Sequence, residues 1–475
     1  MFRKIWHMYI MNRCFRWLKN YFLQGTLGVL FISFIIGFTS LHSQEIKKSN
    51  TDFVQNQKII EKEISNKKII AMSLAQAEQM FANNNLALLA AKFQIDVSRA
   101  GIIQAKLFAN PSISFDQSIF NNKTDRYIDF TRSGQTLIQI QQLFLLGGKI
   151  DKRIKVAEIG LKISEQLFFD LLRALKFELR KNFFSLHYLR ESLNYYERSI
   201  IAFKETAGYA EQAYKKGAIL EAEVLRIKAL LFFLENEKTD VLIQIKQLEA
   251  NLRVLLNNPE LDEVTLVPAV DFNQLNRVKP DDLKISNIIE EAIENRPDLK
   301  IAIHSLRYEQ ANLELEKAKA IPDLSFGPYY DRSGSYIPNS IGFTAQLNIP
   351  IFDRNEGNIE AAEKSVISRR NELQNFRLQA ENEIEVAFNR LNEKERIYRT
   401  YKDTYIQDYQ DLAGYMFSNY EKGYLTIIEF ADFFETYRTS IIQMIRLRIE
   451  RVEAIENLNY NVGKDLLKIQ PEMIE

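Results

Sequence analysis

The chain has 475 residues, which is enough for two or three ordinary domains. Its 62 basic residues balance its 62 acidic residues, so no basic surface points to a nucleic-acid partner. With only 17 Gly and 10 Pro, the composition favours long helices. The single cysteine, Cys14, lies near the N-terminus, so a chain that loses this segment has neither disulfides nor thiol chemistry.

The first 43 residues differ from the rest of the chain. Basic side chains without any acidic one are followed by an apolar run over residues 27–38, and then by small and polar residues. This order is typical of a secretory signal peptide, which we predict over residues 1–43. An uncleaved membrane anchor is the alternative, because the apolar run approaches spanning length. Residues 44–70 are polar and form a predicted lead-in.

A helix is expected from Ser73 to about Phe108, with Ser73 and Gln76 forming a capping box at its start. Pro111 ends this helix, because proline lacks the backbone N–H that a helix needs. The next segments alternate between apolar and polar residues and predict two strands, at about 112–120 and 134–145.

Gly147 and Gly148 close this pair of strands. Alternation with period two gives a strand one apolar and one polar face. In a soluble sandwich the apolar face is core, whereas in an outer-membrane barrel it faces lipid and the polar face lines water. The strands alone leave both interpretations open.

Residues 149–216 contain no proline and predict a helix on the order of 100 Å long. Apolar residues recur along it with a spacing of three and four, which is a heptad pattern and indicates supercoiling with partner helices. Gly217 ends the helix, and a second helix is expected to run back over residues 220–256.

The same order then recurs. Residues 105–115 are echoed by residues 318–326, and the segment from Tyr214 to Gly217 by that from Tyr420 to Gly423. A repeat this long indicates a duplicated domain. The predicted organisation is a first repeat over 71–258, a linker over 259–284, a second repeat over 285–468 and a C-terminal tail over 469–475.

In the second repeat a helix is expected to lead to Pro322, followed by strands at about 323–331 and 340–350, with Pro350 ending the second strand. A long helix over about 358–422 and a return helix to Tyr460 complete the copy. Each repeat is thus predicted as helix, strand, strand, very long helix, glycine turn and return helix.

Two strands per repeat give four per chain, which cannot close a membrane barrel, since the smallest known barrels have about eight. An open sheet edge in lipid leaves backbone N–H and C=O groups without hydrogen bonds, and each such group costs several kcal/mol. If the strands lie in a membrane, several chains must therefore share one barrel. Three chains would supply twelve strands, and their helices would pack into a helical tube.

This pattern resembles the TolC-like outer-membrane efflux proteins over residues 72–465. The resemblance is carried by Asn110-Pro111-Ser112, by the Tyr-x-x-Gly turns and by three segments at residues 146–149, 295–299 and 349–357. It implies a mainly α protein with a small β part. The implied assembly is a homotrimer with a twelve-stranded β-barrel in outer-membrane lipid, continued by a long periplasmic α-helical barrel.

The resemblance also implies the role and the partners. Such a protein is the passive outer-membrane channel of a tripartite efflux system in a diderm bacterium. It docks on a periplasmic adaptor protein and an inner-membrane pump, for which the resistance-nodulation-division type is the candidate. The segments at residues 146–149 and 295–299 look most like the heavy-metal cation branch. A type I protein-secretion duct and a periplasmic coiled-coil scaffold are the alternatives.

By the same resemblance, Tyr214, Gly217, Tyr420 and Gly423 mark the periplasmic tip that docks on the adaptor, and Pro111, Gly147, Gly148, Pro322 and Pro350 mark strand–helix junctions. Family members carry acidic residues after the second turn that narrow the pore. The matching residues are Glu429 and Asp432, which lie three apart on one helix face and are the candidate gate. A solvated helix face is the alternative. Leu425 stands where the family has a basic residue, which puts a salt-bridge lock in doubt.

The sequence holds no nucleophile elbow, phosphate-binding glycine loop or metal-binding motif, so we expect neither an enzyme nor a cofactor. His187 and His304 are isolated on predicted helices, whereas a metal site needs clustered ligands. We therefore expect both histidines to be structural and no metal to be bound.

Overall fold

The computed structural model describes residues 68–467, except for 262–263, 271–279, 281–282, 333–336 and 402–404. The predicted signal peptide (residues 1–43), the lead-in up to residue 67 and the C-terminal tail (residues 469–475) lie outside this part. The chain divides into a unit over Met1–Ile69 and a unit over Ile70–Glu475, and the second unit is described below. None of the described helices has both the length and the apolar character needed to cross a membrane.

The second unit contains two copies of one arrangement. The first copy consists of α3 (Leu74–Asn84), α4 (Leu86–Lys106), β2 (Ser112–Gln117), β5 (Thr136–Phe144), α5 (Lys149–Lys215) and α6 (Glu221–Leu256). The second copy consists of α8 (Ile285–Asn295), α9 (Pro297–Lys319), β7 (Leu324–Asp331), β8 (Ser340–Leu347), α10 (Glu356–Tyr401), α11 (Tyr405–Glu421) and α12 (Ile427–Val462).

Shorter elements connect these parts. A small hairpin of β3 (Phe120–Asn121) and β4 (Arg126–Tyr127) lies between β2 and β5. After α6 come the 3-10 helix η1 (Pro259–Leu261) and strand β6 (Val264–Ala269), and β6 pairs with β1 (Lys68–Ser73). The predicted linker therefore contains a strand that was not expected. The first, third and fifth residues of β6 are buried, so one face of this strand packs against the unit.

The helix expected from Ser73 to about Phe108 is interrupted, and this part of the prediction is wrong. Its start is confirmed, because Ser73 and Gln76 form a capping box. Asn85 then has extended backbone, and its side-chain oxygen accepts a hydrogen bond from the Leu88 N–H at 3.1 Å. Its amide nitrogen donates to the Leu255 carbonyl at 2.9 Å. Asparagine favours such a cap over a helix interior, so α3 ends here and α4 begins.

The helix expected to lead to Pro322 is also two helices. Arg296 is extended, and Pro297 occupies the first turn of α9. Proline disfavours helical backbone in the residue before it but suits the first position of a helix, where no N–H partner is needed. The same two rules therefore explain both the end of α8 and the start of α9.

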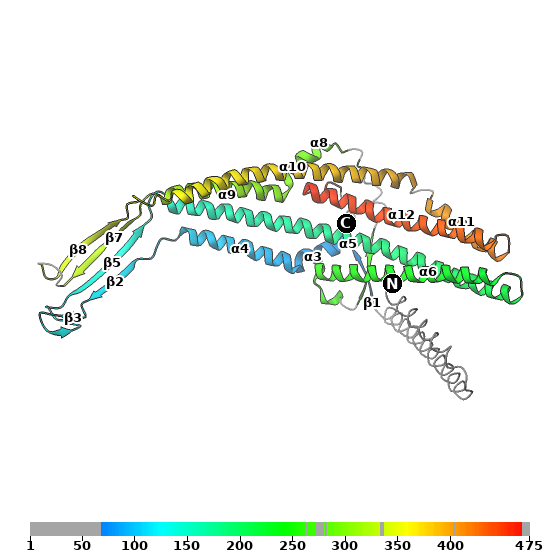
Figure 1. Ribbon diagram of the computed structural model, residues 1–475, viewed down its shortest axis with the longest axis horizontal. Coiled ribbons are helices and arrows are strands. Elements are labelled where there is room, and N and C mark those ends of the chain that lie inside the picture. The colour runs from blue at the N-terminus through cyan, green and yellow to red at the C-terminus, as the bar shows by residue number, and fades with distance from the viewer. Residues whose placement is uncertain are drawn as a thin grey trace, which may run out of the picture. The chain divides into compact units, whose positions relative to one another are not determined.

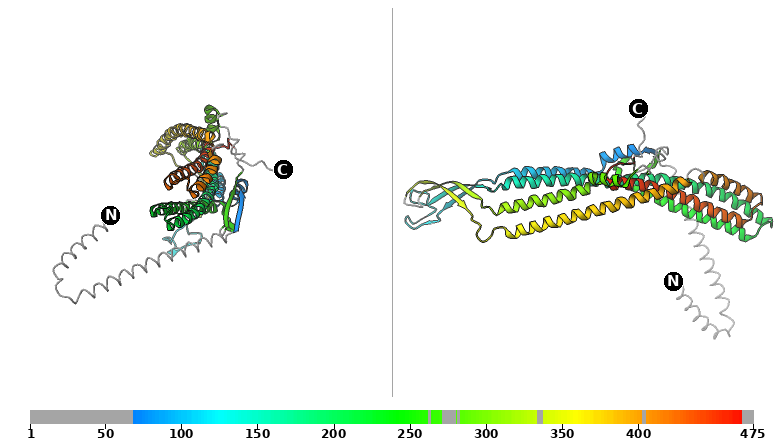
Figure 2. Two further views of the ribbon diagram at one scale, coloured as in Figure 1. Left: turned by 90° about the vertical axis from the view of Figure 1, so that its right-hand side faces the viewer. Right: turned by 90° about the horizontal axis from the view of Figure 1, so that it is seen from above.

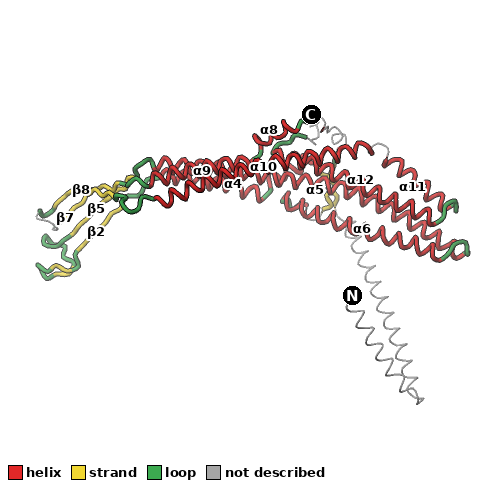
Figure 3. The backbone as a smooth tube through the Cα atoms, turned by 45° about the horizontal axis from the view of Figure 1, so that its top comes forward, coloured by secondary structure: helices red, strands yellow, loops and turns green. Residues whose placement is uncertain are grey.

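The main sheet joins the two copies. Its order is β2-β5-β7-β8, with every neighbouring pair antiparallel. This sheet lies at one end of the helices of the unit, and the turns at Gly217 and Gly423 lie at the other end (Figures 1 and 3). The two views in Figure 2 agree with this placement.

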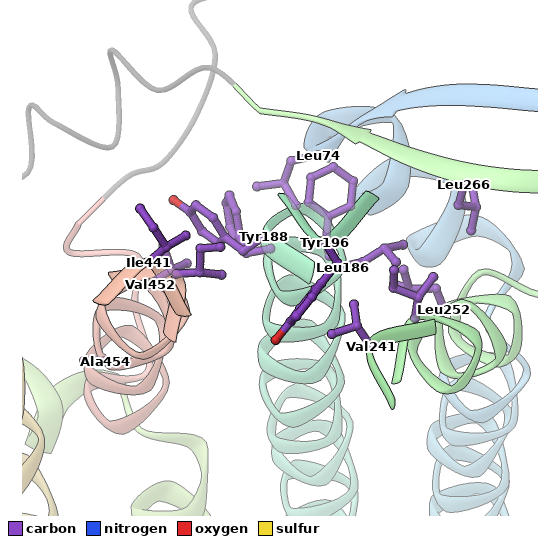
Figure 4. Close-up of a cluster of buried hydrophobic side chains, with 14 of the residues drawn as sticks. Leu74, Leu186, Tyr188, Tyr196, Val241, Leu252, Leu266, Ile441, Val452 and Ala454 are labelled. Carbon is purple, nitrogen blue, oxygen red and sulfur yellow. The ribbon is translucent and has the colours of Figure 1, made fainter. Parts of the chain in front are cut away.

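Helix α5 is the centre of the packing, because it contacts α4, α6, α9 and α12. Figure 4 shows the core midway along it, where Leu186 and Tyr196 of α5 lie among side chains of other elements. Those partners include Leu252 of α6 and Val452 of α12. The apolar seam predicted for the long helix thus packs against helices of both copies.

Candidate functional site

The register of the main sheet collects the apolar residues of both copies on one face. Phe115 of β2 pairs with Ile138 of β5, which pairs with Tyr330 of β7, which pairs with Ile341 of β8. Ile341 is 77% exposed and Phe343 is 70% exposed. Among the residues that the structure describes, no other element buries the apolar face, which is the arrangement expected of strands whose apolar side contacts lipid.

The opposite face is polar and hydrogen-bonded across strands. The Gln139 amide donates to the Thr344 hydroxyl at 2.8 Å, reaching over β7. Gly342 lies beneath the Tyr329 ring, and a Cβ atom there would come within 2.6 Å of it. This side therefore fits the water-lined face of a barrel wall.

At the strand–helix junctions the two copies are tied together by one lysine. Gly147 and Gly148 both have φ of +68°, a left-handed backbone that glycine adopts without strain. This turn brings the Lys149 ammonium to the Asp323 carboxylate at 2.6 Å and to the Ile321 carbonyl at 2.7 Å. Lys149 is buried and Asp323 is partly exposed.

The three prolines predicted at junctions stand next to or between helices and strands. Pro111 directly precedes β2, Pro322 lies between α9 and β7, and Pro350 lies between β8 and α10. Sequence reasoning identified these residues but missed the ion pair of Lys149 and Asp323. The sequence indicated only that Lys149 and Asp323 each stand beside a predicted strand–helix junction.

The segment at residues 295–299 forms a hub of charges between helices. Arg296 pairs with Asp298 at 2.6 Å and with Glu383 of α10 at 2.7 Å, and donates to the Asn461 carbonyl at 3.3 Å. Burial raises the pKa of Asp298, but the hydrogen bonds from Arg296 and the charge of Arg173 outweigh it, so the pKa is lowered overall. This hub fixes α9 against α10 and α12.

A second buried charge cluster was not predicted. Arg180 of α5 contacts Glu78 at 2.6 Å, Glu456 at 2.9 Å and Asp465 at 3.2 Å. Lys176 pairs with the same Asp465 at 2.6 Å. Burial raises the pKa of Glu456, and Arg180 only partly opposes this. The cluster joins α3, α5 and α12, whose residues are too far apart in sequence for any local pattern to connect them.

At the other end of the helices, both Tyr-x-x-Gly turns are the same helix-ending motif. The Gly217 N–H donates to the Tyr214 carbonyl at 2.8 Å, and the next N–H reaches back to Ala213. Gly423 and Tyr420 repeat this geometry at 2.9 Å. The two glycines have φ of +71° and +75°. These are Schellman motifs, which explains why glycine occurs at both positions.

An aromatic cluster holds the second hairpin against α5. The Phe203 ring lies 4.2 Å from the Phe434 ring and 5.7 Å from the Phe430 ring, between centroids. Phe417 packs on Phe203 at 5.5 Å, and Tyr420 stacks on Phe430 at 4.8 Å. Tyr420 therefore has a packing role in the tip.

Glu429 and Asp432 follow the second turn and are both exposed. Glu429 forms a capping box with Thr426, since its carboxylate accepts from the Thr426 N–H at 2.9 Å and hydroxyl at 2.8 Å. These hydrogen bonds from the Thr426 backbone and side chain lower the pKa of Glu429. The corresponding residue of α6 is Glu223, and the N-cap of that helix, Leu220, provides no side-chain cap.

The two histidines lie apart, His187 on α5 and His304 on α9. His187 Nδ1 lies 3.1 Å from the Pro268 carbonyl, which links α5 to β6. Burial lowers the pKa of His304. Across the part of the chain that the structure describes, no group of three or more His, Cys, Asp and Glu residues could hold a metal ion.

The chain was compared with known proteins. Residues 78–258 and 288–464 match the family described as outer membrane efflux protein. The cobalt-zinc-cadmium resistance protein CzcC of Cupriavidus metallidurans is 20% identical over 83% of this chain and 90% of its own length.

Among solved structures, a membrane protein from Pseudomonas aeruginosa superposes with a TM-score of 0.70 at 18% identity, over 82% of this chain and 90% of its own. The Campylobacter jejuni CmeC outer membrane channel superposes with a TM-score of 0.67 at 15% identity, over 83% and 87%.

The family match spans both copies of the repeat. The shared architecture confirms the predicted fold class, a mainly helical duplicated unit with a small β part. The expected location in the outer membrane, with a large periplasmic part, and the role of an efflux channel are confirmed as well. The chain belongs to the outer membrane efflux protein family.

Proposed function

We propose that three copies of this chain close into one passive duct, in which each copy supplies four strands of a twelve-stranded barrel. The observation that carries this proposal is the main sheet, with its uncovered apolar face and its outer strands β2 and β8, which have no partner among the described strands on their free edges. Pairing β8 of one copy with β2 of the next gives hydrogen-bond partners to the backbone groups at these edges, which lipid cannot provide.

The assembly can be tested directly on protein extracted from outer membranes. Native mass spectrometry should give three times the mass of the mature chain. A monomeric mass under conditions that preserve other outer-membrane trimers would contradict the proposal. The scaffold alternative offers no explanation for the apolar sheet face.

As partners we propose a periplasmic adaptor at the tip and an inner-membrane pump, with the resistance-nodulation-division type as the candidate. Tyr214 is 44% exposed beside Gly217, and Gly423 is exposed at the second turn, so both turns offer surface for an adaptor. A duct of this kind transports without catalysis, so we propose that the chain is not an enzyme and needs no cofactor.

As cargo we propose divalent transition-metal cations. The support is the similarity to CzcC, whose name describes resistance to cobalt, zinc and cadmium. The zinc or cobalt concentration that stops growth should be lower for cells that lack this chain than for cells that carry it. Unchanged metal tolerance together with loss of a secreted protein would favour the type I secretion alternative.

At the tip we propose that Glu429 and Asp432 of three chains form a ring of carboxylates that gates the duct. Both residues are exposed in the single chain, and oxygen ligands suit hard multivalent cations. Such a ring should favour cations and should be blocked from the periplasmic side by trivalent ions. The capping box keeps the Glu429 carboxylate at the start of α12, where the helix dipole favours a negative charge.

The gate is tested by single-channel conductance in a planar bilayer with added trivalent cation. The double variant Glu429→Gln with Asp432→Asn should be blocked more weakly, and glutamine retains the capping box. Glu223→Gln is the matched control, because it stands at the equivalent helix position in the first hairpin. If the double variant is blocked as strongly as the parent, these residues form only a solvated face.

A further inference from the structure

The loop between β2 and β5, residues 118–135, lies at the end of the sheet away from the helices (Figure 1). Several of its apolar side chains are exposed. Ile119, Tyr127, Ile128 and Phe130 are between 55% and 76% exposed. Large apolar groups gathered on one loop are typical of a surface that contacts a partner.

A buried carboxylate fixes the shape of this loop. Asp129 accepts hydrogen bonds from the Thr131 hydroxyl at 2.6 Å, the Thr124 hydroxyl at 2.7 Å and the Asn121 amide at 3.1 Å. The hydrogen bonds from Thr131 and then Thr124 hold the pKa of Asp129 well below its usual range. Its negative charge is therefore satisfied inside the loop and is not presented to a partner.

The second copy braces the loop from outside. The Arg332 guanidinium, after β7, donates to the Phe130 carbonyl at 2.6 Å. Ile128 has φ of +47°, a left-handed backbone that is unfavourable for a β-branched residue. The contacts around it thus maintain a strained conformation that places an apolar side chain on the surface. Backbone strain that the surrounding contacts maintain clusters at ligand-binding and other functional sites.

The exposed charge of the loop is positive. Lys123, Arg126 and Arg132 are exposed, and none of the three pairs with a carboxylate within the described residues. Asp125 is the single exposed acidic residue between residues 118 and 135. The loop therefore combines unpaired cations with aromatic and aliphatic side chains at the rim of a membrane sheet.

We propose that this loop binds the phosphate-bearing headgroups of outer-membrane lipid. The cations would pair with phosphate, while Tyr127, Ile128 and Phe130 enter the interfacial layer, where amphipathic rings and apolar groups are favoured. A lipid surface accounts for both features at once, because basic residues attract anionic lipid and apolar residues do not need a shaped pocket there.

The test counts lipid bound to the purified full-length protein by native mass spectrometry, with bisphosphorylated lipid A as the probe and phosphatidylcholine as the reference. Replacing Lys123, Arg126 and Arg132 together by glutamine should lower lipid A affinity on the order of 100-fold, at about fivefold for each cation. Higher salt should weaken binding by the parent in the same direction.

Two further variants separate binding from folding. Ile128→Asn removes the apolar side chain but tolerates the left-handed backbone, so it should lower lipid affinity a few-fold without loss of assembly. Arg370→Gln with Arg377→Gln removes two exposed cations of α10 and should leave lipid A binding unchanged.

Three results would overturn the proposal. The first is unchanged lipid A binding by the triple glutamine variant. The second is equal binding of lipid A and phosphatidylcholine by the parent. The third is a change of oligomeric mass in the triple variant with its lipid count preserved, which would mean that the loop packs on a second copy of the chain.

Discussion

Removal of the Phe203 ring should release the tip of the second hairpin from α5. Phe203 is 0% exposed and contacts the rings of three phenylalanines from α11 and α12. Replacing a buried Phe by Ala costs about 3–5 kcal/mol of stability. Within that cost, each lost contact between two aromatic rings contributes about 0.5–1.5 kcal/mol in addition to the loss of buried area. Phe430 and Phe434 are themselves fully buried, so the cavity cannot collapse easily and the upper half of this range applies.

The loss should be local, because the tip is far from the core midway along α5 and can open on its own. Hydrogen exchange of the segments containing Phe417 and Phe430 should accelerate by roughly 10³-fold to several times 10³-fold, since each 1.4 kcal/mol is a factor of ten. Tyr209→Ala is the control, because Tyr209 lies on the same helix but is 55% exposed.

That control should change stability by less than about 0.5 kcal/mol. If Phe203→Ala and Tyr209→Ala exchange alike at the tip, the aromatic cluster does not hold the hairpin. The same conclusion follows if the acceleration in Phe203→Ala is spread evenly over the whole chain.

Four further predictions concern stability. Gly423→Ala should lower it by about 1 kcal/mol in thermal unfolding, because φ of +75° strains any side chain while open space surrounds the position. Phe343→Arg should cost about 2–4 kcal/mol of membrane assembly near the midplane, and Gln346→Arg far less; equal losses would reverse the assignment of the two faces. Lys149→Met should cost about 2–3 kcal/mol in denaturant unfolding, since its carboxylate partner is left unpaired and only partly exposed. For Asp298, burial raises the pKa but the arginine contacts lower it more. Its contribution to folding stability is therefore fully present above about pH 4 and is lost as the pH falls through the lowered pKa. An Asp298→Asn variant should lack this acid dependence in unfolding scans.

Much of the architecture could be predicted because it depends on local backbone rules. Pro111, Pro322 and Pro350 cannot donate to a helix, and Gly217 and Gly423 adopt the left-handed backbone that ends one. Alternation with period two and the heptad seam follow from side-chain direction along a strand or a helix. These signals repeat in both copies, so the duplicated order of elements was readable from the sequence.

The helix breaks were missed because their causes are weak in sequence or lie elsewhere in the chain. Asn85 ends α3 in part through its bond to the Leu255 carbonyl, which no local pattern announces. Pro297 is a local signal for the break between α8 and α9, and the expectation of one continuous helix did not use it.

The sequence by itself determined the four strands of the main sheet, the long helix of the first copy and the two glycine turns, because backbone torsions and side-chain periodicity act between near neighbours. Only the tertiary structure decided that Lys149 meets Asp323 and that Arg180 meets Glu456, 276 residues away. It also placed the apolar residues of four strands on one face and buried Asp129 within its loop. Those contacts depend on the order in which helices and strands pack side by side, and that order arises from the summed burial of many side chains rather than from any single motif.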